Sequence, residues 1–458
     1  MRKGIICLSL LLITSVIPAY SVTPPKAGAS CSKQGITKTF QGKKFTCIKS
    51  GKKTVWNKGV NVKKPTPTTT PIQTPSPTPT LSAMPTPTPS RSLTSRPTLN
   101  KNVCQLRQNY TNFFYTGFGF PRSQNRLTNQ GDVRGIMLFV EFNDVKGNDD
   151  PLLEGKKFTS NFEEFYRTVS YGRLNFSVDI YPKYIPIQKE SITYRMNEWN
   201  KGEPRTYFSD GLSAADPLID FSKYEFAVLI PPSGITNIIY GPTALSSPPE
   251  TWAKTNEKII YNGVVGGSDQ RNRESTKWIW LSHEIGHALG MEHQYSGYPH
   301  PIWDLMDNVY VTYGPELFAW HRFLQGWLTE SQVACIDSDY LSTDSAIFDV
   351  SALSVPSAKT KTVILKLSDE EALVIETRVN SKFDKFPKSE EGILVYVVNV
   401  NKKSNESAIR LIMPNQVTRI ENYEIGTLKV NESVRSNGYR VSNLGRSESG
   451  FIVDIKKI

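Results

Sequence analysis

Five residues in one short stretch have the types and spacing of a catalytic zinc site. They match H-E-x-x-H-x-x-G-x-x-H at every fixed position: His283, Glu284, His287, Gly290 and His293. On an α-helix His283 and His287 lie about one turn apart, so both imidazoles can bind one metal ion. Gly290 lacks a Cβ and can take the left-handed conformation that ends a helix, which lets His293 return as a third nitrogen ligand. Three protein ligands leave one zinc position for water, whose pKa falls to about 7, and Glu284 is placed to take the proton.

A lone H-E-x-x-H also arises by chance on surface helices, and a decayed site would keep much of the pattern without binding metal. The chain has only five histidines, and three of them fall in this motif with the glycine between them. We therefore expect one catalytic Zn²⁺ as the cofactor.

The motif needs a helix and a sheet to position it. The spacing predicts the active helix over residues 277–290, and apolar or alternating runs predict the elements that precede it. These are strands over residues 134–142, 175–181, 225–230 and 258–265, and a helix over 161–168. Residues 258–265 are expected either to hold an extended substrate at a sheet edge or to form a plain interior strand.

The chain changes character after Cys335. Short apolar runs separated by Gly, Asn, Ser and Pro continue to residue 455 and predict an all-β domain, a sandwich. The fold class expected is therefore α+β. A zinc-peptidase domain with a mixed sheet and an active-site helix spans residues 100–335, and a β-rich domain spans residues 336–458.

The N-terminus has the pattern of an export signal. Arg2 and Lys3 precede an apolar run that ends in Ala19-Tyr20-Ser21, a small-x-small cleavage site. The run is too short to span a membrane comfortably. Residues 1–21 are expected to be removed, so the mature protein is expected to be secreted.

Charge divides the chain into two parts. Residues 1–131 contain 19 Lys and Arg and no acidic residue, which leaves 35 basic and 43 acidic residues in the remainder. The basic part suits an anionic cell wall or membrane surface, although a merely solvated arm is the alternative. No specific nucleic-acid partner is expected.

The basic part has its own organisation. Residues 22–64 read as a small hairpin module with a cysteine pair, weakly similar to Lys-rich modules at the start of secreted actinobacterial proteins. Residues 65–99 are rich in Pro, Thr and Ser and predict an extended spacer. Such a spacer would let the module hold a surface while the enzyme works at a distance.

Four cysteines remain after removal of the signal, and an even number in a secreted chain indicates disulfides. Three pairings are open, of which proximity and position favour Cys31 with Cys47 and Cys104 with Cys335. The weaker alternatives are a zinc-capping thiolate at Cys104 and a lipidated Cys31.

With these motifs in place, the chain resembles the metzincin clan of zinc endopeptidases and, within it, the immune inhibitor A family of secreted bacterial metalloproteases. The segments that carry the resemblance are residues 165–174 (F-Y-R-T-V-S-Y-G-R-L), 303–306 (W-D-L-M), 318–327, 372–378 and 391–396. The likeness covers residues 133–400 and implies that Met306 forms the turn beneath the metal.

The resemblance has departures. Some metzincins place a tyrosine two residues after the turn methionine, where this chain has Asn308. Tyr310 and Tyr313 lie nearby and are candidate donors to the oxyanion. His300 and His321 are expected to be structural or surface residues.

The function expected is a secreted zinc endopeptidase that cleaves proteins with Glu284 as general base and then acid, without a covalent intermediate. The alternatives are a hydrolase of cell-wall peptide crosslinks and an inactive surface-binding protein that retains the protease fold.

Overall fold

The computed structural model describes residues 26–31, 34, 36–40, 43–51, 53–61, 98–109, 116–123, 126–198, 201–241, 243–245, 253–293, 303–307, 315–341, 345–403, 406–414 and 426–458. The chain divides into two compact units, which meet in sequence between residues 89 and 90. The predicted signal peptide and nearly all of the predicted spacer lie outside the described residues. No helix in the described part of the chain is both long and apolar enough to cross a membrane.

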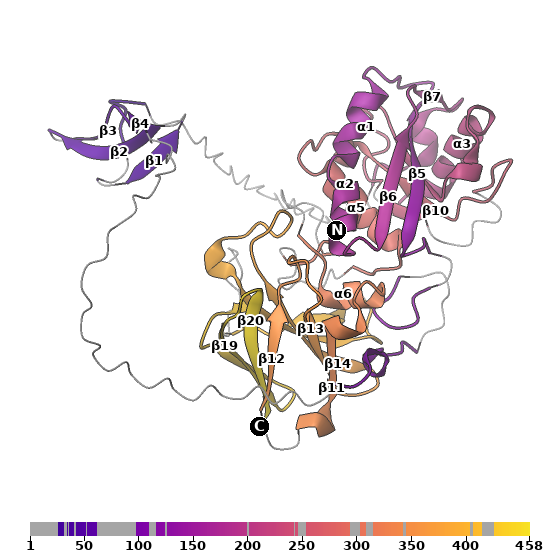
Figure 1. The fold of residues 1–458 in the computed structure, drawn as a ribbon. Coiled ribbons are helices and arrows are strands. Elements are labelled where there is room, and N and C mark those ends of the chain that lie inside the picture. The colour runs from indigo at the N-terminus through magenta and orange to yellow at the C-terminus, as the bar shows by residue number, and fades with distance from the viewer. Residues whose placement is uncertain are drawn as a thin grey trace, which may run out of the picture. The chain divides into compact units, whose positions relative to one another are not determined.

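The first unit contains a small antiparallel sheet in which β2 pairs with the other three strands (Figure 1). Its core is Phe45, Cys47 and Trp56, packed against Cys31. The predicted Cys31–Cys47 disulfide is present, with Cα atoms 6.0 Å apart. The strands are β1 (Thr37–Phe40), β2 (Lys43–Ser50), β3 (Lys53–Trp56) and β4 (Val60–Asn61).

The second unit begins with a sheet of order β6-β5-β8-β10-β9, in which β9 alone runs antiparallel to its neighbour and β7 adds a short pairing to β5. The strands are β5 (Gly131–Glu141), β6 (Leu174–Ile180), β7 (Ile185–Pro186), β8 (Phe226–Ile230), β9 (Thr243–Leu245) and β10 (Asn262–Val265). The helices are α1 (Pro151–Thr159), α2 (Phe162–Val169), α3 (Pro204–Ala215), α4 (Ser268–Arg271), α5 (Lys277–Ala288) and α6 (Ala319–Leu324).

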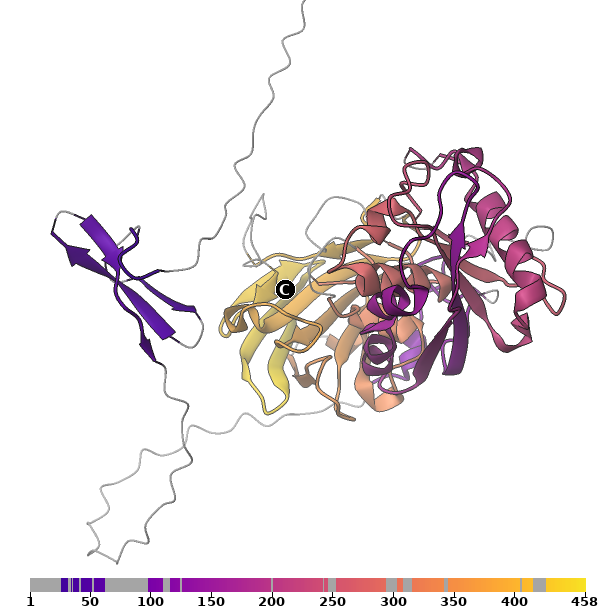
Figure 2. The same ribbon diagram turned by 90° about the horizontal axis from the view of Figure 1, so that it is seen from above.

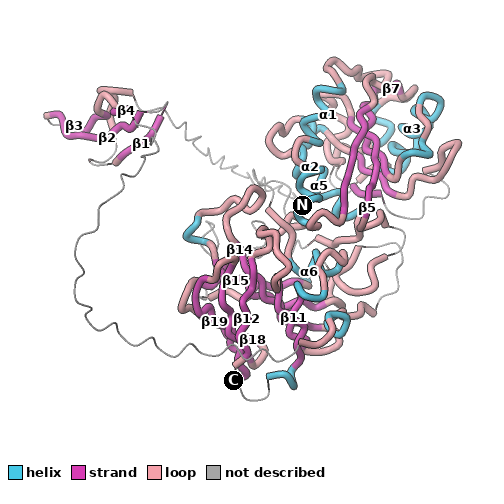
Figure 3. The backbone as a smooth tube through the Cα atoms, in the orientation of Figure 1, coloured by secondary structure: helices cyan, strands magenta, loops and turns pink. Residues whose placement is uncertain are grey.

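Helices cover both faces of this sheet, as Figure 3 shows. Alternate residues of β5 point to opposite sides: Met137 and Phe139 join a core with α1, α2 and α5, whereas Ile136 and Leu138 join a core with α3. Because both faces are buried, the strands read as continuous apolar runs.

The predicted strand over residues 258–265 is shorter than expected, and it is an interior strand. β10 lies between β8 and β9, so the edge-strand role suggested for it is wrong. Among the described strands, β9 is the last on this side of the sheet, and it was not predicted from the sequence. β10 reads N-G-V-V, and so short a run is compatible with either an edge or an interior strand.

The rest of the unit is built from two sheets, of order β11-β13-β14-β15-β16 with β17 on β15, and β12-β20-β19-β18. Their facing side chains form one core, so the predicted sandwich is present beside the α/β part (Figure 2). The strands are β11 (Val333–Asp337), β12 (Ala346–Ser351), β13 (Thr362–Lys366), β14 (Glu371–Arg378), β15 (Gly392–Asn399), β16 (Ile409–Leu411), β17 (Thr427–Leu428), β18 (Ser433–Ser436), β19 (Tyr439–Arg446) and β20 (Gly450–Lys457). The described chain is therefore a mixed α and β protein.

The predicted Cys104–Cys335 disulfide is also present, with Cα atoms 5.9 Å apart. Cys335 lies in β11, so the bridge fastens the segment before the first sheet to the inner sheet of the sandwich. The Leu99 amide adds a 2.9 Å hydrogen bond to the Cys335 carbonyl. Two disulfides indicate that the chain matures in an oxidising environment.

Candidate metal centre

Helix α5 is buried along nearly its whole circumference, with ten of its twelve residues inaccessible to solvent. A helix that is buried on all sides normally has apolar side chains on every face. Two of the buried side chains of α5, His283 and Glu284, are nevertheless polar. Lys277 at its start is held by ion pairs to Glu154 and Glu274. Because buried polar groups are costly without partners, the remaining polar side chains of α5 need a specific explanation.

The helix ends as the motif predicts. Gly290 has φ +92°, and its amide donates to the His287 carbonyl at 2.8 Å. The Met291 amide donates to the Gly286 carbonyl at 3.0 Å. This pair of bonds is a Schellman motif, in which glycine takes the left-handed position without steric cost. The turn brings the chain back at once, and His293 follows three residues later.

The rings of His283 and His287 are held by backbone carbonyls. His283 Nδ1 donates to the Leu305 carbonyl at 2.8 Å, and His287 Nδ1 donates to the Met291 carbonyl at 2.9 Å. With the proton fixed on Nδ1, each neutral ring offers its Nε2 lone pair. Histidines that bind metal are commonly fixed in this way.

The protonation state fits the same role. Burial, followed by the neighbouring charge of His287, holds the pKa of His283 well below its usual range. Burial lowers the pKa of His287 to about 3. Both imidazoles are therefore neutral at ordinary pH, which is the form that binds a metal.

His293 lies beside this pair. The ring centroids of His283 and His287 are 4.8 Å apart, and those of His287 and His293 are 5.1 Å apart. Two imidazoles on one tetrahedral zinc have centroids separated by about 5 Å, as Zn–N bonds of about 2 Å require. Burial lowers the pKa of His293 against the opposing charge of Glu292, whose Oε1 lies 3.1 Å from its Nδ1.

Among the residues that the structure describes, no group of three or more His, Cys, Asp and Glu side chains is already gathered as a metal-binding set. The ring spacings of the three histidines, and the Nδ1 protons fixed on carbonyls at His283 and His287, are compatible with zinc. A closed set of three ligands is thus part of the proposal below.

Glu284 is buried beside the first of these histidines, with 3% of its surface exposed. Tyr166 of α2 packs against the same stretch of helix and donates its hydroxyl to the Ser282 carbonyl at 2.5 Å. Burial, followed by the charges of Glu284 and Asp304, raises the pKa of Tyr166 well above its usual value. The tyrosine therefore stays neutral and anchors the helix.

A turn at residues 303–307 lies against α5. The Asp304 carboxylate accepts the amides of Met306 and Phe318, each at 2.7 Å. Burial opposes ionisation of this carboxyl, but the adjacent His321 and the two amides hold its pKa below its usual range. The turn thereby directs the Leu305 carbonyl at His283, and Met306 packs beneath the helix.

Met306 contacts α5 between the two histidines. A Cβ added at Gly286 would lie 2.4 Å from Met306 Sδ. Gly286, the glycine of the H-E-I-G-H segment, is therefore required for close approach of the turn. The structure places Met306 against α5, while its position beneath a bound metal stays a prediction.

Gly286→Ala is expected to destabilise the protein by about 1–3 kcal/mol, because the new methyl group overpacks the contact with Met306. It should also weaken zinc binding, because the displaced segment lies between two candidate ligands. Urea unfolding and zinc titration measure the two effects.

Gly211→Ala in α3 is the matched control, since its Cβ would lie 2.1 Å from Leu229 Cδ2 on the other face of the sheet. It should destabilise the protein similarly and leave zinc affinity unchanged. Equal zinc affinity in all three proteins would contradict a supporting role for Met306.

Two groups of predicted residues have different outcomes. Asn308, Tyr310, Tyr313 and His300 lie outside the described residues. His321 is buried in α6 and donates from Nδ1 to Asp304 Oδ2 at 2.9 Å, which agrees with the expected structural role.

No role for Asp304 was predicted from the sequence, although the W-D-L-M segment contains it. The same is true of Arg122 and Arg126, which donate to the carbonyls of Leu289 and His287 at the end of α5. Cations near a helix C-terminus are stabilising, but nothing in their sequence neighbourhood indicates this partner.

The chain matches no known protein-family model and no curated protein sequence.

Proposed function

We propose that the protein is a secreted zinc-dependent endopeptidase of metzincin type, similar to the immune inhibitor A family. The observation that carries this proposal is the pair of neutral histidines on α5, each with its Nδ1 proton fixed on a carbonyl. His293 has the ring spacing of a third ligand. The intact glutamate between the first two histidines supports catalysis over simple metal storage.

In this proposal His283, His287 and His293 hold zinc through ring nitrogens. Bound zinc supplies Lewis-acid chemistry toward a peptide carbonyl and a water molecule. Glu284 takes the proton of the attacking water and delivers it to the leaving amine. Met306 supports the helix from below by packing.

The sheet offers a place for the substrate. In the part of the chain that the structure describes, β9 is the last strand of the first sheet and runs antiparallel to β10. An extended peptide can add to such an edge by backbone hydrogen bonds, which hold internal bonds of a chain in reach of the site. This supports an endopeptidase in preference to an enzyme that trims chain ends.

The test is digestion of casein beside digestion of purified cell wall by the secreted protein, with released amines as the readout. Cleavage of casein supports the proposal. Amine release from wall alone would make the protein a hydrolase of wall peptide crosslinks. Cleavage of neither substrate by zinc-loaded protein would favour the inactive surface-binding alternative.

We also propose that the basic first unit binds an anionic wall or membrane surface. Its strands expose Lys44, Lys49 and Lys53, and residues 1–131 contain no acidic side chain. Binding of this kind is electrostatic and weakens with salt.

Changing these three lysines to glutamate is expected to reduce sedimentation of the mature protein with phosphatidylglycerol vesicles by about tenfold or more, because each basic residue contributes substantially to such binding. Glutamates at the exposed Lys156, Lys183 and Lys388 serve as the control of equal net charge. Equal loss in both triple variants would mean that net charge alone, and no particular unit, determines binding.

A further inference from the structure

The inner sheet of the sandwich is buried on both faces. Val363, Leu373 and Ile375 face the outer sheet. On the opposite face, Val374 and Tyr396 pack against Trp303, Phe318 and Trp320 of the α/β part. The inner sheet of the sandwich therefore supplies part of the apolar core that packs against Trp303, the first residue of the turn at 303–307.

Ionic side chains lie inside this second face. Arg378, at the end of β14, is fully buried with Glu376 and Asp384. Its Nε lies 2.6 Å from Glu376 Oε1, and its Nη1 lies 3.0 and 2.9 Å from the two oxygens of Asp384. These two carboxylates raise the pKa of Arg378 against the effect of burial, so the guanidinium remains charged.

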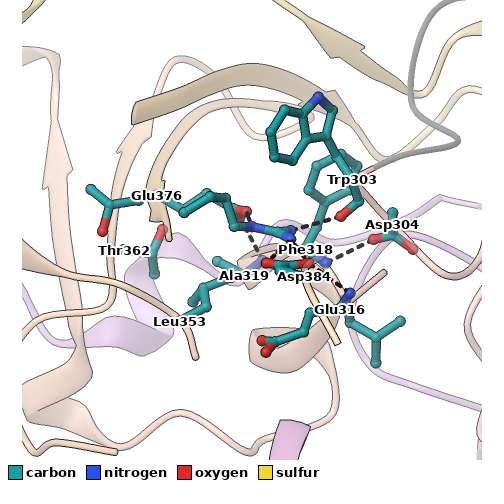
Figure 4. A network of polar contacts seen from close by, with 12 residues as sticks. Trp303, Asp304, Glu316, Phe318, Ala319, Leu353, Thr362, Glu376 and Asp384 are labelled. Carbon is teal, nitrogen blue, oxygen red and sulfur yellow. Dashed lines mark hydrogen bonds and ion pairs between the residues drawn. The ribbon is translucent and has the colours of Figure 1, made fainter. Parts of the chain in front are cut away.

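The remaining donor of Arg378 reaches the turn. Its Nη2 donates to the Trp303 carbonyl at 2.8 Å. Figure 4 labels Trp303, Asp304, Glu376 and Asp384 within one network of polar contacts, whose bonds are dashed. One residue after Trp303, the Asp304 carboxylate fixes the Met306 amide, and the Leu305 carbonyl between them holds His283.

The two carboxylates hold the following segment too. Glu376 Oε2 accepts the Ala319 amide and the Tyr396 hydroxyl, each at 2.7 Å. Asp384 Oδ1 accepts the Glu316 amide at 2.9 Å. The sandwich thus fixes the chain on both sides of Asp304, whose carboxylate joins the turn to the start of α6.

The energetics favour a positioning role over a purely stabilising one. Burying an ion pair contributes little net stability, because desolvation offsets the attraction. What such a network supplies is a fixed geometry, since every bond has a preferred direction. Partners that orient a ligating histidine commonly change metal affinity by about 10- to 100-fold when they are lost.

We propose that the β-sandwich is an integral part of the metal centre and that Arg378 is its positioning residue. Acting through the Trp303 carbonyl, Arg378 sets the turn whose Leu305 carbonyl orients His283. This inference rests on the proposed zinc function.

Arg378→Lys is the informative variant. It keeps the positive charge between Glu376 and Asp384, but it loses the planar fork that reaches Asp384 and Trp303 together. We expect the dissociation constant for zinc to rise by about tenfold or more. We also expect the visible absorption bands of the cobalt-substituted protein to shift, because the ligand field at His283 changes.

Two further variants separate positioning from stability. Val453→Ala removes volume from the core between the sheets and leaves the ionic network intact. Its zinc affinity and cobalt bands should equal those of the wild type, even where its melting temperature falls as far as that of Arg378→Lys. Tyr396→Phe removes the hydroxyl that donates to Glu376 and accepts the Trp320 amide. It should shift both metal readouts in the direction of Arg378→Lys, by less.

All binding is measured on the mature chain at a temperature where each variant is folded. Wild-type zinc affinity and cobalt bands in Arg378→Lys would overturn the proposal and leave the protease function standing. If Arg378→Lys does not fold, unchanged metal readouts in Tyr396→Phe would overturn it equally. A wild-type protein that binds no zinc would instead overturn the proposed function, and this inference with it.

Discussion

Changing Glu284 to glutamine is expected to lower kcat/KM for casein by about 100- to 10,000-fold, which is the usual contribution of general acid–base catalysis. Glutamine has nearly the same shape in this buried position, but it cannot take a proton from water. Zinc content should stay at the wild-type level, because the proposed ligands are His283, His287 and His293. The variant therefore separates chemistry from metal binding.

The measurement is initial-rate kinetics on casein beside zinc analysis of the same preparation. Tyr166→Phe, which removes only the bond to the Ser282 carbonyl, is the control for disturbance of α5. It should retain most of the activity. Cleavage by Glu284→Gln at more than about a tenth of the wild-type rate would remove Glu284 from the mechanism.

His287→Ala is expected to abolish both zinc binding and cleavage, because two nitrogen ligands cannot complete a catalytic zinc site. Residues that only orient a ligand typically change zinc affinity by about 10- to 100-fold when they are lost. Loss of the ligand His287 itself should lower zinc affinity by roughly a further factor of 10 or more. Equilibrium dialysis with zinc measures it.

Ile279→Ala on the same helix is the matched control, because this side chain is fully buried in the apolar core and carries no donor. It should destabilise the fold and leave bound zinc unchanged. Retention of one zinc by His287→Ala would assign the metal to other residues.

The parts of the fold that the sequence predicted are those set by local pattern. Helix α5 and its end at Gly290 follow from the motif spacing and from the conformational freedom of glycine. Strands such as β5, β8 and β14 follow from apolar runs, and the two disulfides follow from the number and position of the cysteines.

Long-range pairing set the rest. The sequence of residues 262–265 predicts a buried strand but does not show whether that strand has one neighbour or two. β10 is an interior strand because β9 pairs with its second side. The segment E-T-R at residues 376–378 alternates as though its charges faced water, yet Glu376 and Arg378 are fully buried against the α/β part. The ion-pair partners of such a buried charged residue can be identified only in the folded structure, because they depend on how the sandwich packs against the α/β part.

The candidate site likewise has a part that the sequence predicts and a part that only the folded chain reveals. The proximity of the three histidines could be predicted because their spacing is local to one helix and one turn. The Leu305 carbonyl that orients His283 lies 22 residues away in sequence. Backbone acceptors carry no sequence signal, so such partners emerge only from the folded chain.

The most direct test of the central claim is the zinc content and casein cleavage of the mature secreted protein before and after a chelator. The account predicts about one zinc per chain, loss of cleavage when the metal is removed, and recovery when zinc is restored. A protein that cleaves casein without metal, or that binds no zinc at all, would contradict it.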